Sequence, residues 1–260
     1  APHAKDKLNE HIDRVACQTC HIPEFARGGI AKKMLWDWST GGKRGPDGKP
    51  LYITDDHGHL IYSAEKGDFK YAENVRPEYK WYNGVVHQIA ITDKIDDSGI
   101  LEINRVEGAA NDPKARIWPF KVMHGKQPYD TVNKTLVVNH VFGKDDTAFW
   151  TNFDYAKAIQ AGMDYAGLPY SGKFGFIETR MNWFITHMVA PKEKAVPCGE
   201  CHTKSAAGRL SGLTDFYMPG RDAKPWLDII GWTVVALAIL GGLAHALVRV
   251  TIARRNRRKS

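Results

Sequence analysis

The sequence predicts an α+β fold in which short helices flank an irregular, hairpin-rich middle and one long apolar helix follows at the C-terminal end. Three observations predict it. The pattern CxxCH occurs at residues 17–21 and again at 198–202, turn-forming residues divide residues 26–84 into short runs, and residues 229–248 contain no Asp, Glu, Lys or Arg. Of the 260 residues, 43% are hydrophobic and 25% are charged. This composition excludes a disordered, a collagen-like and a multi-span membrane chain.

The net charge of +7 comes from one end of the chain. Six cations lie within the last twelve residues, and without them the remaining side chains are close to neutral. A basic patch or stripe is what a nucleic-acid-binding surface requires. We therefore expect no nucleic-acid partner. The six cations are Arg249, Arg254, Arg255, Arg257, Arg258 and Lys259.

The two CxxCH motifs contain every cysteine of the chain. CxxCH is the attachment signature of c-type haem. Its two sulfurs reach the two vinyl groups of the porphyrin, and the histidine that follows supplies an axial nitrogen to the iron. The sequence therefore predicts two covalently attached haem c groups and an irregular, multihaem cytochrome c type of fold with haem-bearing helices. The predicted haem-binding residues are Cys17, Cys20, His21, Cys198, Cys201 and His202.

Other uses of the four cysteines explain less of the pattern. A four-cysteine zinc site requires two pairs that are separated by 177 residues to converge on one metal. A redox dithiol needs only one CxxC in a strand–helix context. Structural disulfides fit the cysteine count. None of the three explains a histidine directly after both pairs.

The first 143 residues predict one short helix and a series of hairpins. Residues 8–11 predict a helix just before the first motif. Between residues 26 and 84, pairs such as Gly-Gly and Asp-Gly separate runs of aromatic and β-branched residues, including 51–54 and 60–62. This alternation indicates β-hairpins. Residues 85–143 continue as short strands and loops.

The pattern changes to a helical period at Asp146. Apolar side chains then recur every three or four residues as far as Gly167, which indicates one helix that ends at this glycine. A second helix is predicted over residues 178–188, leading toward the second motif.

The uncharged run 229–248 is long enough to cross a membrane. Twenty helical residues rise about 30 Å, the thickness of a bilayer core. Trp226 and Trp232 lie at its start, where interfacial aromatic side chains are common, and the basic tail follows it. Positive residues stay on the cytoplasmic side, so the chain's N-terminal part is expected outside. Covalent haem attachment on the outer side of an energy-conserving membrane agrees with this orientation.

The expected organisation has three parts. Residues 1–225 form a periplasmic dihaem cytochrome c domain, residues 226–249 form the transmembrane helix, and residues 250–260 form a basic cytoplasmic tail. The predicted location is the cytoplasmic (inner) membrane, crossed once.

His245 lies inside the predicted span. An ionisable side chain at membrane depth is a functional candidate, and Gly241 lies one turn before it. The small residues Ala238, Gly242 and Ala246 would admit a close partner helix. We therefore expect a membrane cytochrome b or a quinone-reactive subunit as partner, with His245 as a ligand to haem b or a contact to quinone. Alternatively, the imidazole extends to the cytoplasmic headgroups.

Eleven histidines exceed what two haems require. A low-spin haem needs a second axial ligand, usually His or Met. His11 and His187 each lie on a predicted helix that leads into a haem motif, so we expect them to be distal ligands. At least one of His87, His124 and His140 is expected to ligate or closely contact a haem carried by another multihaem cytochrome subunit or segment.

Three segments resemble the octahaem c-type cytochromes of the tetrathionate reductase family. They are residues 15–23 (VACQTCHIP), residues 120–130 (FKVMHGKQPYD), and residues 183–191 (WFITHMVAP) together with the motif at 198–202. The resemblance implies that the two motifs correspond to the last two haems of that family. Membrane-anchored members of the family also end in one C-terminal helix.

The same resemblance implies eight haems, one with a lysine as the proximal ligand at the catalytic iron. This chain contains no CxxCK, so no catalytic residue is assigned.

We expect a membrane-anchored c-type cytochrome subunit that transfers electrons between a quinone-linked membrane partner and further haems of a multihaem complex. The alternative is part of a multihaem reductase of a sulfur or nitrogen oxyanion such as tetrathionate, with a pocket lined by His124, Lys126 and Tyr129. The chain is a fragment, a split subunit, or a reduced relative that only transfers electrons.

Covalent attachment has a direct test. The intact, denatured chain is expected to exceed the mass of its polypeptide by two haems, because thioether bonds survive denaturation. Replacement of Cys17 and Cys20 together by Ala is expected to remove one haem, and replacement of Cys198 and Cys201 the other. A mass equal to that of the bare polypeptide would contradict the assignment.

Overall fold

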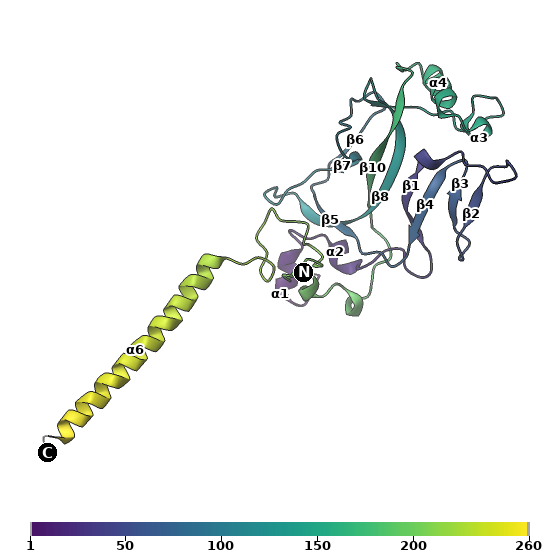
Figure 1. Ribbon diagram of the computed structural model, residues 1–260. Helices are drawn as coiled ribbons and strands as arrows, with labels where there is room; N and C mark the ends of the chain where they lie inside the picture. The colour runs from purple at the N-terminus through teal and green to yellow at the C-terminus, as the bar shows by residue number, and fades with distance from the viewer. Residues whose placement is uncertain (1, 259–260) are drawn as a thin grey trace. The chain divides into compact units, whose positions relative to one another are not determined.

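The computed structural model describes residues 2–258 and has the mixed α+β composition that the sequence predicts (Figure 1). The chain divides into two compact units, Ala1–Glu200 with Gly212–Phe216, and Cys201–Ser211 with Tyr217–Ser260. The helices are α1 (Asp6–His11), α2 (Cys17–His21), α3 (Phe149–Asn152), α4 (Tyr155–Ala166), α5 (Cys198–Cys201) and α6 (Pro225–Arg257). The strands are β1 (Lys32–Asp37), β2 (Tyr52–Thr54), β3 (Leu60–Ser63), β4 (Gly67–Ala72), β5 (Glu78–Tyr82), β6 (Val86–Gln88), β7 (Leu101–Val106), β8 (Arg116–Asp130), β9 (Thr135–Leu136) and β10 (Phe174–Phe184).

Strand β8 is the centre of a ten-stranded mixed sheet. Along one edge it pairs with β10 in antiparallel register, from Phe120 opposite Phe184 to Asp130 opposite Phe174. The other edge is shared by three strands in succession: β5 first, then β1, then β9. Strands β4, β3 and β2 extend the sheet beyond β1, and β7 and β6 extend it beyond β10. One long strand therefore connects all parts of the sheet.

The predicted hairpins and the helix before the first motif are confirmed. Strands β2 and β3 pair in antiparallel register, and α1 covers the predicted residues 8–11. The expectation of only short strands in residues 85–143 is wrong, because β8 has 15 residues. Pro119 and Pro128 make this strand hard to recognise, since proline cannot donate to a ladder and normally indicates a strand edge.

The predicted helix over residues 178–188 is also wrong. These residues belong to β10 and to the coil that follows it. Ile177, Thr179 and other β-branched or aromatic side chains favour a strand, and the buried positions Ile177 and Thr179 alternate as a strand requires. Pairing with β8 along the whole length of β10 overrides the helical spacing.

The helix predicted from Asp146 to Gly167 is divided in two. Phe153 between α3 and α4 adopts a left-handed conformation with φ of 58°. Asp154 then caps α4 by accepting a hydrogen bond from the backbone N–H of Lys157. The predicted end is confirmed, because Gly167 terminates α4 with φ of 64°.

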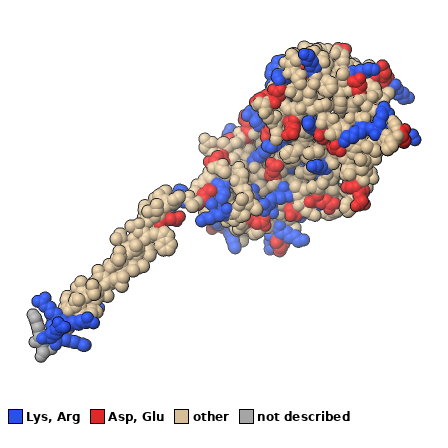
Figure 2. Space-filling view, in the orientation of Figure 1, with Lys and Arg blue, Asp and Glu red and all other residues tan. Residues whose placement is uncertain are grey.

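Helix α6 contains the predicted span and continues beyond it. Within residues 2–258 it is the one helix that is long and apolar enough to cross a membrane. Its 33 residues correspond to about 50 Å. Figure 2 shows an uncharged stretch along α6 and blue cations at its C-terminal end. The basic tail predicted at 250–260 is therefore helical as far as Arg257.

The buried carboxylate of Asp130 connects the C-terminal end of β8 to the residues just before β10. Its Oδ1 accepts hydrogen bonds from the backbone N–H groups of Val132 and Asn133 and from Ser171 Oγ. Its Oδ2 accepts from Asn133 Nδ2 and from the N–H of Ser171. Burial alone would raise the pKa of Asp130, but the hydrogen bonds from Asn133 and Ser171 outweigh it and lower the pKa to about 2.

The Asp130 network predicts a loss of stability in acid. The folded pKa lies below the ordinary value of 3.8, so the carboxylate's contribution is present above about pH 4 and is lost as the pH falls toward 2. At pH 7, Asp130→Ala is expected to cost on the order of 3 kcal/mol, because several buried donors lose their acceptor. Urea unfolding of wild type and Asp130→Asn across this pH range checks the prediction. Equal acid sensitivity of the two proteins would contradict it.

Candidate haem sites

The first CxxCH motif forms the short helix α2. Helical spacing places Cys17, Cys20 and His21 on one face, because residues three and four apart lie above one another. Cys17 is exposed, Cys20 and His21 are half-buried, and Thr19 on the opposite face is buried. The motif therefore presents both sulfurs and the imidazole together, while the opposite face of the helix packs on the fold.

Helix α2 is fixed to β8 through the backbone of Ile117. The carbonyl oxygen of Ile117 accepts hydrogen bonds from the N–H of Ala16 at 3.0 Å and from Thr19 Oγ1 at 2.7 Å. The N–H of Ile117 donates to the carbonyl of Arg14 at 2.8 Å. These bonds bracket the start of α2, so the position of the first haem motif follows from the position of β8.

The segment before the second motif lies against the first motif. The N–H of Ala190 donates to the carbonyl of His21 at 2.7 Å, and the N–H of Val196 donates to the carbonyl of Cys20 at 2.9 Å. Cys198 follows Val196 by two residues, and two residues span at most about 7 Å. The two motifs, far apart in sequence, therefore begin next to each other in the first unit.

The histidine of the second motif is oriented by a hydrogen bond to a backbone carbonyl. Cys198–Cys201 form α5, and in the second unit His202 Nδ1 lies 2.7 Å from the carbonyl oxygen of Pro219. A carbonyl only accepts, so Nδ1 is the donor in this bond. This is how a metal-ligating imidazole is usually oriented. The residues therefore fit a haem whose iron is held by His202.

Two further predicted ligands, His11 and His187, have different surroundings. His11 lies on α1, where its Nδ1 is 2.7 Å from the carbonyl of Lys7. His187 is exposed in coil after β10, so the aromatic helix predicted to present it does not exist. The N–H of Ala190, three residues later, bonds to His21, which places this coil beside the first motif. Ligation by either histidine stays a prediction.

Among the other predicted histidines, two have carboxylate partners. His87 Nε2 bonds to Glu107, and His140 Nε2 lies 3.2 Å from Asp145 Oδ2. A carboxylate therefore occupies the Nε2 of each of these two imidazoles. His245 lies on the surface of α6. Within residues 2–258, no three or more His, Cys, Asp or Glu side chains form a group that could hold a metal ion.

The proposed oxyanion pocket is only partly assembled. His124 and Lys126 line a pocket of about 220 Å³, but so do the carboxylates of Asp37 and Glu178. Tyr129 is not in its lining, and its hydroxyl donates to Asp97 at 2.8 Å. Two negative side chains oppose an anionic substrate, so this pocket does not match the predicted one.

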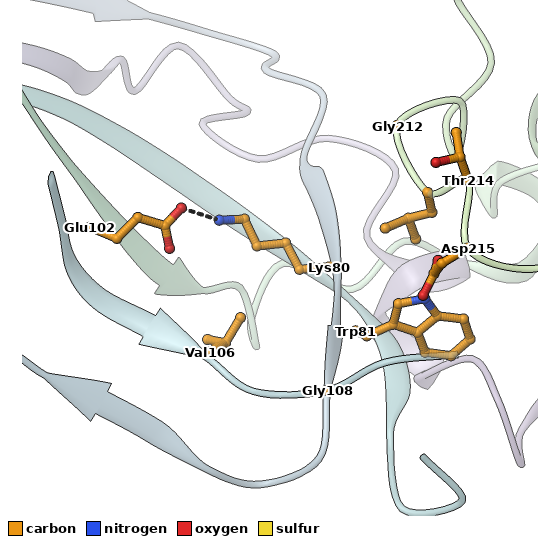
Figure 3. Close-up of a pocket in the computed structure, with 9 residues that line it drawn as sticks. Lys80, Trp81, Glu102, Val106, Gly108, Gly212, Thr214 and Asp215 are labelled. Carbon is orange, nitrogen blue, oxygen red and sulfur yellow. Dashed lines mark hydrogen bonds and ion pairs between the residues drawn. The ribbon is translucent and has the colours of Figure 1, made fainter. Parts of the chain in front are cut away.

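In a second pocket, of about 340 Å³, each charged side chain has a partner (Figure 3). Lys80 Nζ lies 3.3 Å from Glu102 Oε1, and the indole N–H of Trp81 donates to Asp215 Oδ1 at 3.1 Å. The backbone N–H of Ala110 donates to the other oxygen of Asp215. The pairing stabilises the fold at this position and provides no set of metal or haem ligands.

One histidine that the sequence analysis did not single out lies at the first motif. The ring of His3 is 6.2 Å from the ring of His21, centre to centre, and the two planes differ by 11°. Thirteen residues separate His3 from Cys17 in sequence. No helical spacing or motif connects them, so only the tertiary structure identifies the pair.

Comparisons with known proteins agree with the site. Residues 33–205 match the family described as "Cytochrome c bacterial". The chain is also similar to the crystal structure of octaheme cytochrome c from Shewanella oneidensis, with 38% sequence identity and a TM-score of 0.76. That match covers 85% of this chain and 50% of the other, so the chain spans about half the length of the octaheme protein. The comparison with curated proteins found no match.

Gly220 is expected to control the second site through Pro219. It has φ of 82°, and a Cβ there would lie 3.0 Å from the carbonyl oxygen of His202. Gly220→Ala should cost on the order of 1–3 kcal/mol and displace the Pro219 carbonyl from Nδ1. A weaker hydrogen bond makes the imidazole a poorer donor to iron, so the potential of the second haem should rise. Redox titration measures this shift.

Gly212→Ala is the matched control, because a Cβ at Gly212 meets nothing within 4 Å. It should leave both potentials unchanged. The same potentials in Gly220→Ala as in wild type would contradict the role of the Pro219 carbonyl.

Proposed function

Because the chain belongs to the bacterial cytochrome c family and is a multihaem c-type cytochrome with covalently bound haem c, we propose that it relays electrons between haems attached at its two CxxCH motifs. It passes them between a quinone-linked membrane partner and further haems of a larger multihaem assembly. Bound haem supplies iron that alternates between the ferrous and ferric states. The chain's own residues hold, orient and tune that iron.

The observation that carries the proposal is the contact between the two motifs. Val196 and Ala190 donate backbone hydrogen bonds to Cys20 and His21, so the attachment points of the two haems begin side by side. Electron transfer requires a short path between the two haem edges. Thioether bonds at Cys20 and Cys198 would keep those edges at neighbouring places on a rigid backbone.

The axial histidines would set the potentials. His202 donates from Nδ1 to the Pro219 carbonyl, which increases the basicity of its other nitrogen and favours the ferric state. His21 has a second imidazole facing it instead. Different surroundings for two identical ligands support different potentials, which a directional relay needs.

We further propose that other haems are held by another segment or subunit. The chain spans about half of the octaheme protein that it resembles, and its eleven histidines exceed what two haems require. His11 and His124 are candidate contacts to those further haems. We also propose that the chain is a member of the tetrathionate reductase family. The alternative function, reduction of a sulfur or nitrogen oxyanion by this chain itself, has less support, because Asp37 and Glu178 line the pocket that contains His124 and Lys126.

We propose that α6 anchors the chain in the inner membrane, with residues 1–225 on the periplasmic side. Its length, apolar surface and C-terminal cations support this orientation. The small residues around Gly241 and Gly242, together with His245, support a membrane cytochrome b or quinone-reactive partner. In that complex His245 would ligate haem b or contact the quinone.

The relay predicts that Val196→Pro slows electron exchange between the two haems. Proline removes the N–H that bonds to Cys20, which should cost about 1 kcal/mol and loosen the second motif from the first. Val196→Ala keeps the N–H and should behave as wild type. Flash reduction of one haem, followed by the spectrum of the other, measures the exchange. Equal exchange rates in Val196→Pro and Val196→Ala would count against the proposed contact path.

The anchor predicts that the full chain stays with membranes after an alkaline wash. The double variant Leu237→Asp and Leu240→Asp should be released, because each buried carboxylate costs about 2.5–3.5 kcal/mol at the centre of a span. His245→Leu should stay in the membrane. If His245 ligates haem b, membranes that contain the His245→Leu variant should also lose a b-type haem signal. Release of the wild-type chain by the wash would contradict anchoring.

A further inference from the structure

The histidine of the first haem motif has a second imidazole beside it. His21 is the histidine of the motif, and His3 faces it with a ring separation of 6.2 Å and nearly parallel planes. We propose that His3 is the second axial ligand of the haem attached at Cys17 and Cys20. This inference rests on the proposed function, because it requires haem at the first motif.

The separation of the two rings suits a shared metal ion. A metal–imidazole bond is about 2 Å, and the ring centre lies roughly 1 Å beyond the nitrogen, so two imidazoles on opposite sides of one ion have centres roughly 6 Å apart. Two rings in direct face contact would be closer, at about 4 Å, as with Phe149 and Tyr155, whose centres are 4.0 Å apart. His3 and His21 are therefore separated by the space that one metal ion requires.

The backbone of His3 is fixed in place by Asn9 of α1. The N–H of His3 donates to Asn9 Oδ1 at 3.0 Å, and Asn9 Nδ2 donates to the carbonyl oxygen of His3 at 2.9 Å. This pair of bonds uses both ends of one amide side chain. These bonds fix the backbone of His3, and therefore the point from which its ring extends toward His21.

The ring of His3 also has unused bonding capacity. Its Nδ1 is buried and has no hydrogen-bond partner among the described residues. Buried polar atoms without a partner are rare, and a bound ion is one of their ordinary explanations. Coordination to iron would give the His3 ring the polar partner that its Nδ1 does not have among the described residues.

Two imidazole ligands would give this haem a defined role. A six-coordinate iron has no open position, so the first haem would carry electrons and would not bind an external substrate. Replacement of one imidazole by a methionine thioether raises the potential of a c-type haem. Asn9 would be a positioning residue, since it contacts the ligand and not the iron.

The test uses the full chain in detergent with three variants. His3→Ala removes the ligand, His3→Met replaces it with a thioether, and His57→Ala is the matched control in an exposed turn. Intact mass first establishes that each protein carries haem at both motifs. Three measurements follow: the low-spin and high-spin spectrum, carbon monoxide binding by the reduced protein, and the midpoint potential of each haem.

The expected result is one additional carbon monoxide bound per chain in His3→Ala, together with a high-spin component. His3→Met should return that haem to the low-spin form with a raised potential. His57→Ala should match wild type. Asn9→Ala should show a high-spin fraction between those of wild type and His3→Ala.

An unchanged spectrum, carbon monoxide stoichiometry and potential in both His3 variants would overturn the proposal. If His3→Ala fails to fold or to retain haem, the potential of His3→Met decides alone. A wild-type chain without haem at the first motif would instead overturn the proposed function, and the mass distinguishes that failure from this one.

Discussion

The backbone of Ile117 is the constraint on which the arrangement of the haem motifs depends. Its carbonyl oxygen accepts hydrogen bonds from Ala16 and Thr19, and its N–H donates to Arg14. A five-residue helix has too few internal hydrogen bonds to be stable by itself. Helix α2 therefore takes its position from the strand beneath it, and so do the two sulfurs and the imidazole on its outer face. Any change that moved β8 would move the first haem site with it.

The same strand explains how the second motif reaches the first. Strand β10 follows β8 along its whole partner edge and ends at Phe184, opposite Phe120. Ile185 then packs into a buried cluster with Ile22 and Phe25, directly after the first motif. From there the chain is close enough for Ala190 and Val196 to bond to that motif. The convergence of the motifs is thus a consequence of strand pairing and of one small apolar cluster.

The two motifs share a pattern but not an environment. In the first, the imidazole of His21 faces the ring of His3. In the second, His202 is oriented by the carbonyl of Pro219, and the left-handed Gly220 allows the backbone to pass close to it. Identical ligands in different surroundings acquire different electronic character, because hydrogen bonds and neighbouring groups tune the metal. Two haems can therefore have different reduction potentials even though both are attached through the same CxxCH motif.

The sequence by itself determined the features that depend on neighbouring residues. CxxCH is a local pattern, so covalent haem c could be predicted, and the family match agrees with it; the proximal residues His21 and His202 stay predictions. The hairpin of β2 and β3, the end of α4 at Gly167 and the apolar helix α6 were predicted and are confirmed. Only the tertiary structure decided the features that depend on distant residues. Residues 178–184 have apolar side chains that suit a helix or a strand, and pairing with β8 selected the strand. His3 carries no motif, yet Asn9 and the path of the chain bring it to His21. Strand pairing and ring placement arise from long-range contacts that no local pattern records.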